Sequence, residues 1–203
     1  MLKIAVFVSG GGTDLQSIID FEKSGQLNNG TVALVISNRK KAYGLERAKN
    51  AGIEAVWEKD QHKIMEILEA RNIDLIVLAG YLAILSEEFV QKYEHRIINI
   101  HPSLIPAFCG DGMYGMHVHE AVLKRGAKIS GATVHFVNEI TDGGPIILQE
   151  AVKVLDDDTP ESLQARILEV EHKILPAAIS LYCNNRLEIN NGKVRIKNEK
   201  SVN

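Results

Sequence analysis

An amide, an imidazole and a carboxylate lie at the ends of apolar segments of this 203-residue chain. Asn99 and His101 belong to the segment Asn-Ile-His-Pro-Ser-Leu-Ile-Pro, and Asp142 begins Asp-Gly-Gly-Pro. If the apolar residues before His101 form a strand, Asn99 and His101 point to the same side of it. An amide can hold a carbonyl oxygen, an imidazole can move a proton near neutral pH, and a carboxylate can raise the pKa of that imidazole. The three side chains therefore indicate acyl transfer.

A glycine-rich loop follows the first apolar segment. Residues 9–14 read Ser-Gly-Gly-Gly-Thr-Asp, and glycines there let backbone N–H groups approach an anion at the start of a helix. The loop lacks the third glycine of a dinucleotide fingerprint and the lysine of a Walker A loop. We therefore expect it to bind a phosphorylated small molecule. A tight turn capped by Thr13 is the alternative.

Other polar residues have weaker patterns. His117 and His119 are two apart, but no third ligand stands at a spacing that suits a metal site. Cys109 has no paired base nearby in the sequence, so nucleophilic thiol chemistry is not expected. His135 lies on an alternating segment, where a structural or surface role is expected.

Short apolar segments alternate with segments of helical spacing in the first half of the chain. Strands are expected at 2–8, 31–36, 53–57, 74–79 and 96–100, and helices at 15–21, 44–50, 62–70 and 86–93. This alternation predicts an α/β fold with a doubly wound, mostly parallel sheet flanked by helices.

The second half predicts two further extended segments, 130–137 and 145–154, and then one long helix. Thr159 and Pro160 are a helix cap and a first-turn proline, and the helix runs toward Cys183. Asn191-Gly192 predicts a type I′ turn in a C-terminal hairpin over 187–196. We expect a single domain over 1–196 and a disordered tail over 197–203.

Composition excludes several classes of protein. The chain is 45% hydrophobic and 24% charged, with a net charge of −3 and no long basic run, so nucleic acid is not the expected partner. No apolar run approaches the ~20 residues of a membrane span, so no membrane is expected either. Two cysteines in unlike contexts do not make a disulfide framework, which favours a reducing, cytoplasmic compartment.

Six segments occur together in one order. They are Ser-Gly-Gly-Gly-Thr-Asp-Leu-Gln, Val-Leu-Ala-Gly-Tyr, Asn-Ile-His-Pro-Ser-Leu-Ile-Pro, Thr-Val-His-Phe-Val, Asp-Gly-Gly-Pro-Ile-Ile-Leu-Gln and Glu-His-Lys-Ile-Leu-Pro. Over residues 1–190 the chain closely resembles the phosphoribosylglycinamide formyltransferase family, folate-dependent enzymes of purine biosynthesis with a Rossmann-like fold. The His-Pro-Ser-Leu-x-Pro segment alone marks the wider formyltransferase superfamily.

The resemblance implies transfer of a formyl group from 10-formyltetrahydrofolate, a co-substrate, to the amine of glycinamide ribonucleotide, without a metal. It implies that Asn99, His101 and Asp142 are catalytic, with Asn99 and a protonated His101 stabilising an oxyanion. It places the nucleotide on Gly11, Gly12, Thr13, Asp14, Leu168, Glu169, Val170 and Glu171, with Glu171 on the ribose hydroxyls. It places the folate on Leu82, Ala83, Ile84, Leu85, Asn99, Asn138, Glu139, Ile140, Thr141 and Asp142. The partners are then small molecules, and the protein is a monomer or a homodimer.

The chain departs from the family pattern at several positions. Asp14 stands where the family more often has asparagine, and Ala83 where many members have arginine. Residues 111–115 resemble an insertion, and the folate contacts of the shortened segment 58–63 cannot be assigned from the sequence. The alternatives are a methionyl-tRNA formyltransferase, a formyltetrahydrofolate hydrolase, or a non-catalytic Rossmann-like module that binds a phosphorylated metabolite. We expect the first two to carry an extra domain for which this chain has no room.

Overall fold

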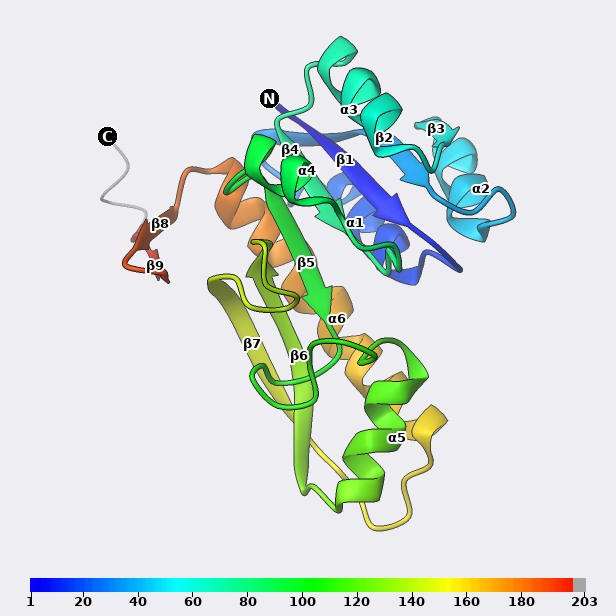
Figure 1. The fold of residues 1–203 in the computed structure, drawn as a ribbon, viewed down its shortest axis with the longest axis vertical. Helices are drawn as coiled ribbons and strands as arrows, with labels where there is room; N and C mark the ends of the chain where they lie inside the picture. The colour runs from blue at the N-terminus through cyan, green and yellow to red at the C-terminus, as the bar shows by residue number, and fades with distance from the viewer. Residues whose placement is uncertain (199–203) are drawn as a thin grey trace.

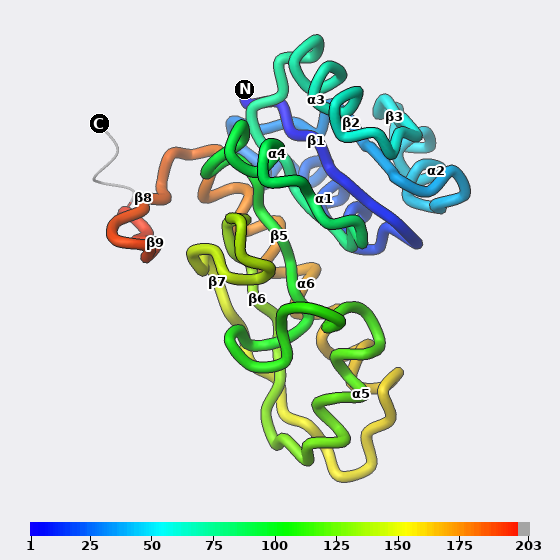
Figure 2. The backbone as a smooth tube through the Cα atoms, viewed as in Figure 1, coloured from blue at the N-terminus to red at the C-terminus, as the bar shows by residue number. Residues whose placement is uncertain are grey.

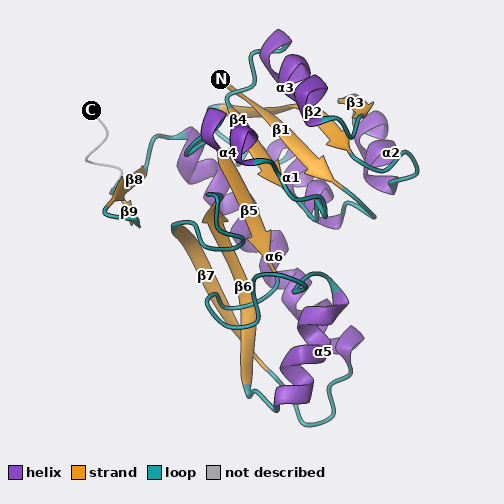
Figure 3. Ribbon diagram, viewed as in Figure 1, coloured by secondary structure: helices purple, strands orange, loops and turns teal. Residues whose placement is uncertain are grey.

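The structure, a computed structural model, describes residues 1–198 and contains one seven-stranded sheet with helices on both faces (Figures 1 and 3). The strands are β1 (Leu2–Val8), β2 (Gly30–Ser37), β3 (Glu54–Trp57), β4 (Leu75–Leu78), β5 (Ile97–His101), β6 (Ile129–Phe136) and β7 (Ile146–Lys153). Their order across the sheet is β3-β2-β1-β4-β5-β6-β7. Strands β1 to β5 are parallel, whereas β6 and β7 are antiparallel to their neighbours. The predicted α/β class and mostly parallel sheet are confirmed.

The helices form two layers. Residues of α1 (Thr13–Lys23), α2 (Tyr43–Asn50), α5 (Met116–Arg125) and α6 (Pro160–Cys183) join the hydrophobic cluster on one face. Residues of α3 (Gln61–Ala70) and α4 (Glu87–Lys92) join the cluster on the other face. Because β1 and β4 are covered on both faces, the side chains of β4 and those of β1 from Ile4 onward are apolar without alternation.

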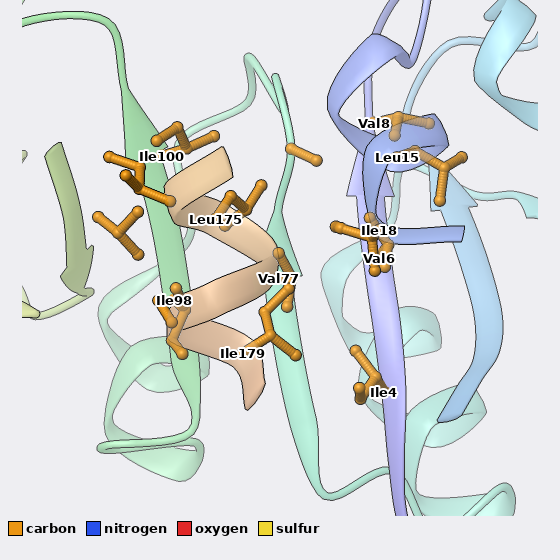
Figure 4. Packing of buried hydrophobic residues seen from close by; sticks show 14 of the residues in the cluster. Ile4, Val6, Val8, Leu15, Ile18, Val77, Ile98, Ile100, Leu175 and Ile179 are labelled. Atoms are coloured by element: carbon orange, nitrogen blue, oxygen red, sulfur yellow. The ribbon is translucent and has the colours of Figure 1, made fainter. Parts of the chain in front are cut away.

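Helix α6 packs over the central strands of the sheet. In Figure 4 its Leu175 and Ile179 lie over β4 and β5, next to Val77, Ile98 and Ile100. The helix begins as predicted at Thr159, whose side chain accepts a hydrogen bond from Ser162 N, and Ser162 Oγ accepts one from Thr159 N. Such a reciprocal cap contributes about 1 kcal/mol and fixes where the helix starts.

The C-terminal hairpin is also confirmed. Strands β8 (Leu187–Asn190) and β9 (Lys193–Ile196) pair through a turn in which Asn191 and Gly192 both have positive φ, as a type I′ turn requires. The pairing continues to Lys197, whose N–H donates to Arg186 O. Of the tail predicted over 197–203, residues 199–203 lie outside the described part of the chain. No helix within residues 1–198 is long and apolar enough to span a membrane.

Candidate active site

A cavity of about 550 Å³ lies at the carboxyl edge of the sheet, where open α/β sheets bind ligands. Residues that follow β4, β5 and β6 line it together with residues of α6. Figure 2 follows the chain through the long connection from β5 to α5, which supplies residues 110–115 of the wall. The cavity therefore gathers segments that are more than a hundred residues apart.

The three predicted catalytic residues all line this cavity. Asn99 and His101 lie near the end of β5, and both reach the same cavity, as their spacing predicts. The Asp142 carboxylate is 3.6 Å from His101 Nδ1 and accepts a hydrogen bond from Gly110 N at 2.9 Å. His101 Nε2 lies 2.9 Å from Phe108 O. Because a carbonyl oxygen only accepts, Nε2 of His101 carries the hydrogen.

His135 is a fourth member of this cluster, and of its predicted structural or surface role the surface location is wrong. It is buried and lines the cavity, with Nε2 3.1 Å from Asn99 Nδ2 and 3.6 Å from Asp142 Oδ1. Its Nδ1 lies 2.8 Å from Phe136 O and must donate to it, so Nε2 of the neutral ring accepts from the Asn99 amide. The antiparallel pairing of β6 on β5 brings His135 opposite Asn99, and the sequence alone does not reveal that pairing.

The electrostatics of the cluster differ in one respect from the prediction. Burial lowers the pKa of His101; the Asp142 charge and the Phe108 carbonyl act in the opposite direction but do not outweigh it. The expected net rise in the pKa of His101 is therefore not found, and the neutral imidazole dominates at pH 7. Burial acts to raise the pKa of Asp142, but the hydrogen bond from Gly110 N–H and the neighbouring His101 lower it below its usual value.

Side-chain hydrogen bonds hold the loop that follows His101. Thr133 Oγ1 on β6 donates to Ser103 O and accepts from Ile105 N, and Ser103 Oγ donates to Ala107 O. These bonds tie residues 103–107 to the sheet. The next residue, Phe108, presents its carbonyl to His101, so the loop fixes the position of the imidazole.

The loop that carries Asp142 depends on its glycines. Asp142 has φ +54°, an uncommon conformation for a residue with a side chain. A Cβ on Gly144 would lie 1.8 Å from Phe136 O, and one on Gly143 would lie 2.6 Å from the Ile140 side chain. Only glycine fits at both positions, which allows the turn to fold back and place the Asp142 carboxylate beside His101.

The glycine-rich loop lies beside the cavity. Gly12 has φ +71°, and a Cβ there would lie 2.8 Å from the Gly44 Cα of α2. The first helical hydrogen bond of α1 runs from Gln16 N to Gly12 O, so earlier N–H groups precede the ladder and can face an anion. Gly12, not Thr13, is the N-cap residue, and no side chain caps the helix.

The predicted nucleotide residues divide into two groups. Asp14, Leu168 and Glu171 line the cavity, and Glu171 is only 5% exposed. The structure does not bring the others into its wall: Gly11, Gly12 and Thr13 lie beside it, Glu169 is exposed on the outer face of α6, and Val170 belongs to the core. Burial raises the pKa of Glu171 well above its usual value, and the neighbouring Asp14 charge raises it further.

The predicted folate residues line the cavity without exception. Residues 82–85 form one side, and residues 138–142 form another. Leu82, Ile84 and Ile140 are exposed apolar side chains, as expected of a surface that covers a flat apolar ligand. The inserted segment 111–115 also belongs to the wall.

Side chains of the types that bind metals occur throughout the described residues, 1–198. Within residues 1–198, no group of three or more His, Cys, Asp or Glu side chains is arranged to hold a metal ion. His119, set aside in the sequence as half of a metal pair, is instead a buried residue of α5 in the cavity wall. Both cysteines are free thiols.

Comparison with known families decides the family. Residues 2–179 match the family described as Formyl transferase. The chain belongs to the formyl transferase family. This result confirms the resemblance seen in the six sequence segments.

Individual relatives of this formyl transferase agree. The phosphoribosylglycinamide formyltransferase of Haemophilus influenzae is 41% identical over 198 residues, which cover 93% of this chain and 91% of that protein. The chloroplastic phosphoribosylglycinamide formyltransferase of Arabidopsis thaliana is 42% identical over 92% of this chain and 67% of its own length. The crystal structure of glycinamide ribonucleotide transformylase 1 from Symbiobacterium toebii superposes with a TM-score of 0.91 at 43% identity, covering 98% of this formyl transferase and 95% of that chain.

Proposed function

We propose that the protein transfers the formyl group of 10-formyltetrahydrofolate to the amine of N1-(5-phospho-D-ribosyl)glycinamide, or glycinamide ribonucleotide. The observation that carries the proposal is the convergence of Asn99, His101 and Asp142 in one cavity. The names of the relatives give the same reaction class.

In the proposed reaction the amine attacks the formyl carbon, and a tetrahedral intermediate with a negative oxygen forms. The Asn99 amide donates one N–H to His135, which leaves its second N–H for that oxygen. The Asp142 carboxylate, ionised because its pKa is lowered, accepts the proton that the attacking nitrogen loses. The proton passes to N10 of the folate as the carbon–nitrogen bond breaks.

His101 has a defined part in the same step. Its Nε2–H is the second donor to the developing oxygen, and its Nδ1 faces Asp142. In the structure Phe108 O accepts the Nε2–H, so the step requires that carbonyl to give way. Phe108 has φ +51° and Gly110, two residues later, has φ +88°, so two residues of this segment have left-handed backbone conformations.

The two substrates fit opposite parts of the cavity. Apolar side chains of residues 82–85 and Ile140 suit the flat ring system of a folate. Leu168 and Glu171 face the cavity from α6, near the start of α1, where N–H groups suit a phosphate and a carboxylate suits a sugar diol. The proposal includes monomers or homodimers working on small molecules in a reducing compartment such as the cytoplasm.

Formyl transfer assays with purified protein test the proposal. With 10-formyltetrahydrofolate present, we expect turnover that depends on glycinamide ribonucleotide. Release of formate without that nucleotide would instead indicate a hydrolase. Absence of turnover, together with binding of the nucleotide, would indicate a non-catalytic binding module.

A further inference from the structure

Two buried polar atoms face each other where α1 meets α6. Asp14 Oδ1 lies 3.6 Å from His172 Nε2. Both atoms are buried, and neither has a hydrogen-bond partner within residues 1–198. Asp14 is 9% exposed and lines the cavity, while His172 is partly exposed outside the cavity wall. A buried polar group without a partner is costly, so this arrangement requires an explanation.

The described residues of the cavity wall around Asp14 supply negative charge and no lysine or arginine to balance it. The cavity is lined by six carboxylates, and no lysine or arginine occurs among the described residues of its wall. Asp14 is the second residue of α1, beside the N–H groups that suit a phosphate. Arg47 lies on the other side of this loop, where it donates to Gly11 O and Gln16 Oε1. A bare carboxylate so close to a bound phosphate would repel it.

We propose that His172 supplies the proton that balances Asp14, so that the pair, rather than a bare carboxylate, faces the phosphoribosyl end of the substrate. This inference rests on the proposed function and adds His172 to it as a specificity-determining position. A proton on Nε2 would face Asp14 Oδ1, and a shift of well under 1 Å would bring the two atoms within hydrogen-bond distance. Burial raises the pKa of Asp14 above its usual value, and the neighbouring His172 offsets only part of that rise.

A double-mutant cycle on substrate affinity tests the pair. His172→Gln removes the cation and leaves the carboxylate, so we expect glycinamide ribonucleotide to bind at least about tenfold more weakly. Asp14→Asn removes the need for that cation. In the Asp14→Asn background, we therefore expect His172→Gln to change nucleotide affinity less than about twofold. Affinity for 10-formyltetrahydrofolate should be unchanged in all three variants.

The chain offers a matched control. His117 Nδ1 and Glu120 Oε2 are 3.7 Å apart on α5, at nearly the same separation, but both side chains are exposed. The corresponding cycle with His117→Gln and Glu120→Gln should show no coupling in nucleotide affinity, because solvent screens exposed pairs. Calorimetric titration with glycinamide ribonucleotide and thermal melts of every variant supply the data.

Three outcomes are distinguishable. Rescue of His172→Gln by Asp14→Asn in nucleotide affinity supports the pair. Additive effects on affinity, or coupling seen only in the melting temperature, would overturn it and leave a structural tie between α1 and α6. Wild-type protein that neither binds nor formylates the nucleotide would contradict the proposed function itself.

Discussion

Asn99 and His135 lie directly opposite each other on the antiparallel strands β5 and β6, with Asn99 Nδ2 3.1 Å from His135 Nε2. His135 Nδ1 donates to Phe136 O, which fixes the ring tautomer and hence the direction of the Asn99 amide. An amide held this way presents its remaining N–H toward the cavity without reorganisation. Preorganised donors of this kind stabilise developing charge more than mobile ones.

His135 is therefore predicted to act through Asn99. His135→Ala should lower kcat about tenfold, because the amide loses its orientation. In an Asn99→Ala background the same change should cost little more. Steady-state kinetics of the four proteins measure this coupling, with His62→Ala, an exposed histidine of α3, as the control. Fully additive losses would show that His135 has a separate role.

His101 and Asp142 are predicted to carry the chemical step, His101 as a donor to the developing oxygen and Asp142 as the proton acceptor. His101→Ala or Asp142→Asn should lower turnover by at least ~100-fold while the melting temperature changes little. Single-turnover kinetics separate the chemical step from substrate binding. Near-normal turnover in a folded His101→Ala protein would contradict the mechanism.

The pH dependence of kcat/KM follows from the lowered pKa of His101. Protonated His101 would pair with Asp142 and remove its carboxylate from proton transfer, so activity should fall on the acid side, below pH 6.5. The Asp142 charge acts to raise the pKa of His101. In Asp142→Asn, the His101 imidazole should therefore gain its proton at still lower pH, which NMR titration of the ring measures. An acid limb above pH 6.5 in the wild type would contradict the effect of burial.

Gly12 is predicted to matter for the nucleotide alone. Gly12→Ala or the larger Gly12→Val should raise the KM for glycinamide ribonucleotide far more than for the folate, because a Cβ strains the loop and pushes it from Gly44. Gly25→Ala is the control, since Gly25 also has positive φ but nothing lies within 4 Å of its Cβ position. Equal effects on both substrates would show that the loop is only a turn.

Glu171 is predicted to strengthen nucleotide binding at a cost in the stability of the fold. Its folded-state pKa lies well above the usual 4.5, so its contribution to stability is lost as pH rises from 4.5 through that folded value. Glu171→Gln should thus raise the free energy of unfolding by roughly 1 kcal/mol at pH 8 and very little at pH 4. Nucleotide affinity should fall by roughly 1–3 kcal/mol with the folate unaffected. Denaturant titration at both pH values and calorimetry check the two halves; unchanged nucleotide binding would remove Glu171 from the site.

The sequence by itself determined the elements and their class. Continuous apolar runs such as that of β1 require burial on both faces, and the Thr159 cap and Asn191-Gly192 turn are local signals that need no distant contact. The same local patterns placed Asn99, His101 and Asp142 at the ends of elements. Resemblance over the six segments then pointed to the cavity residues 82–85 and 138–142.

Only the tertiary structure decided which polar groups meet. His135 meets Asn99 because β6 runs antiparallel to β5, and Asp14 faces His172 because α1 packs against α6. Neither pairing can be inferred from residue spacing. The direction of the His101 pKa shift was also decided by the tertiary structure. The sequence shows that Asp142 carries a charge, but the burial that lowers the pKa of His101 depends on every element around the cavity. Glu169 and Val170 are predicted site residues that the fold keeps out of the cavity wall. Their neighbour Glu171 reaches the cavity, but the 3.6-residue helical period turns them to the outer face and the core.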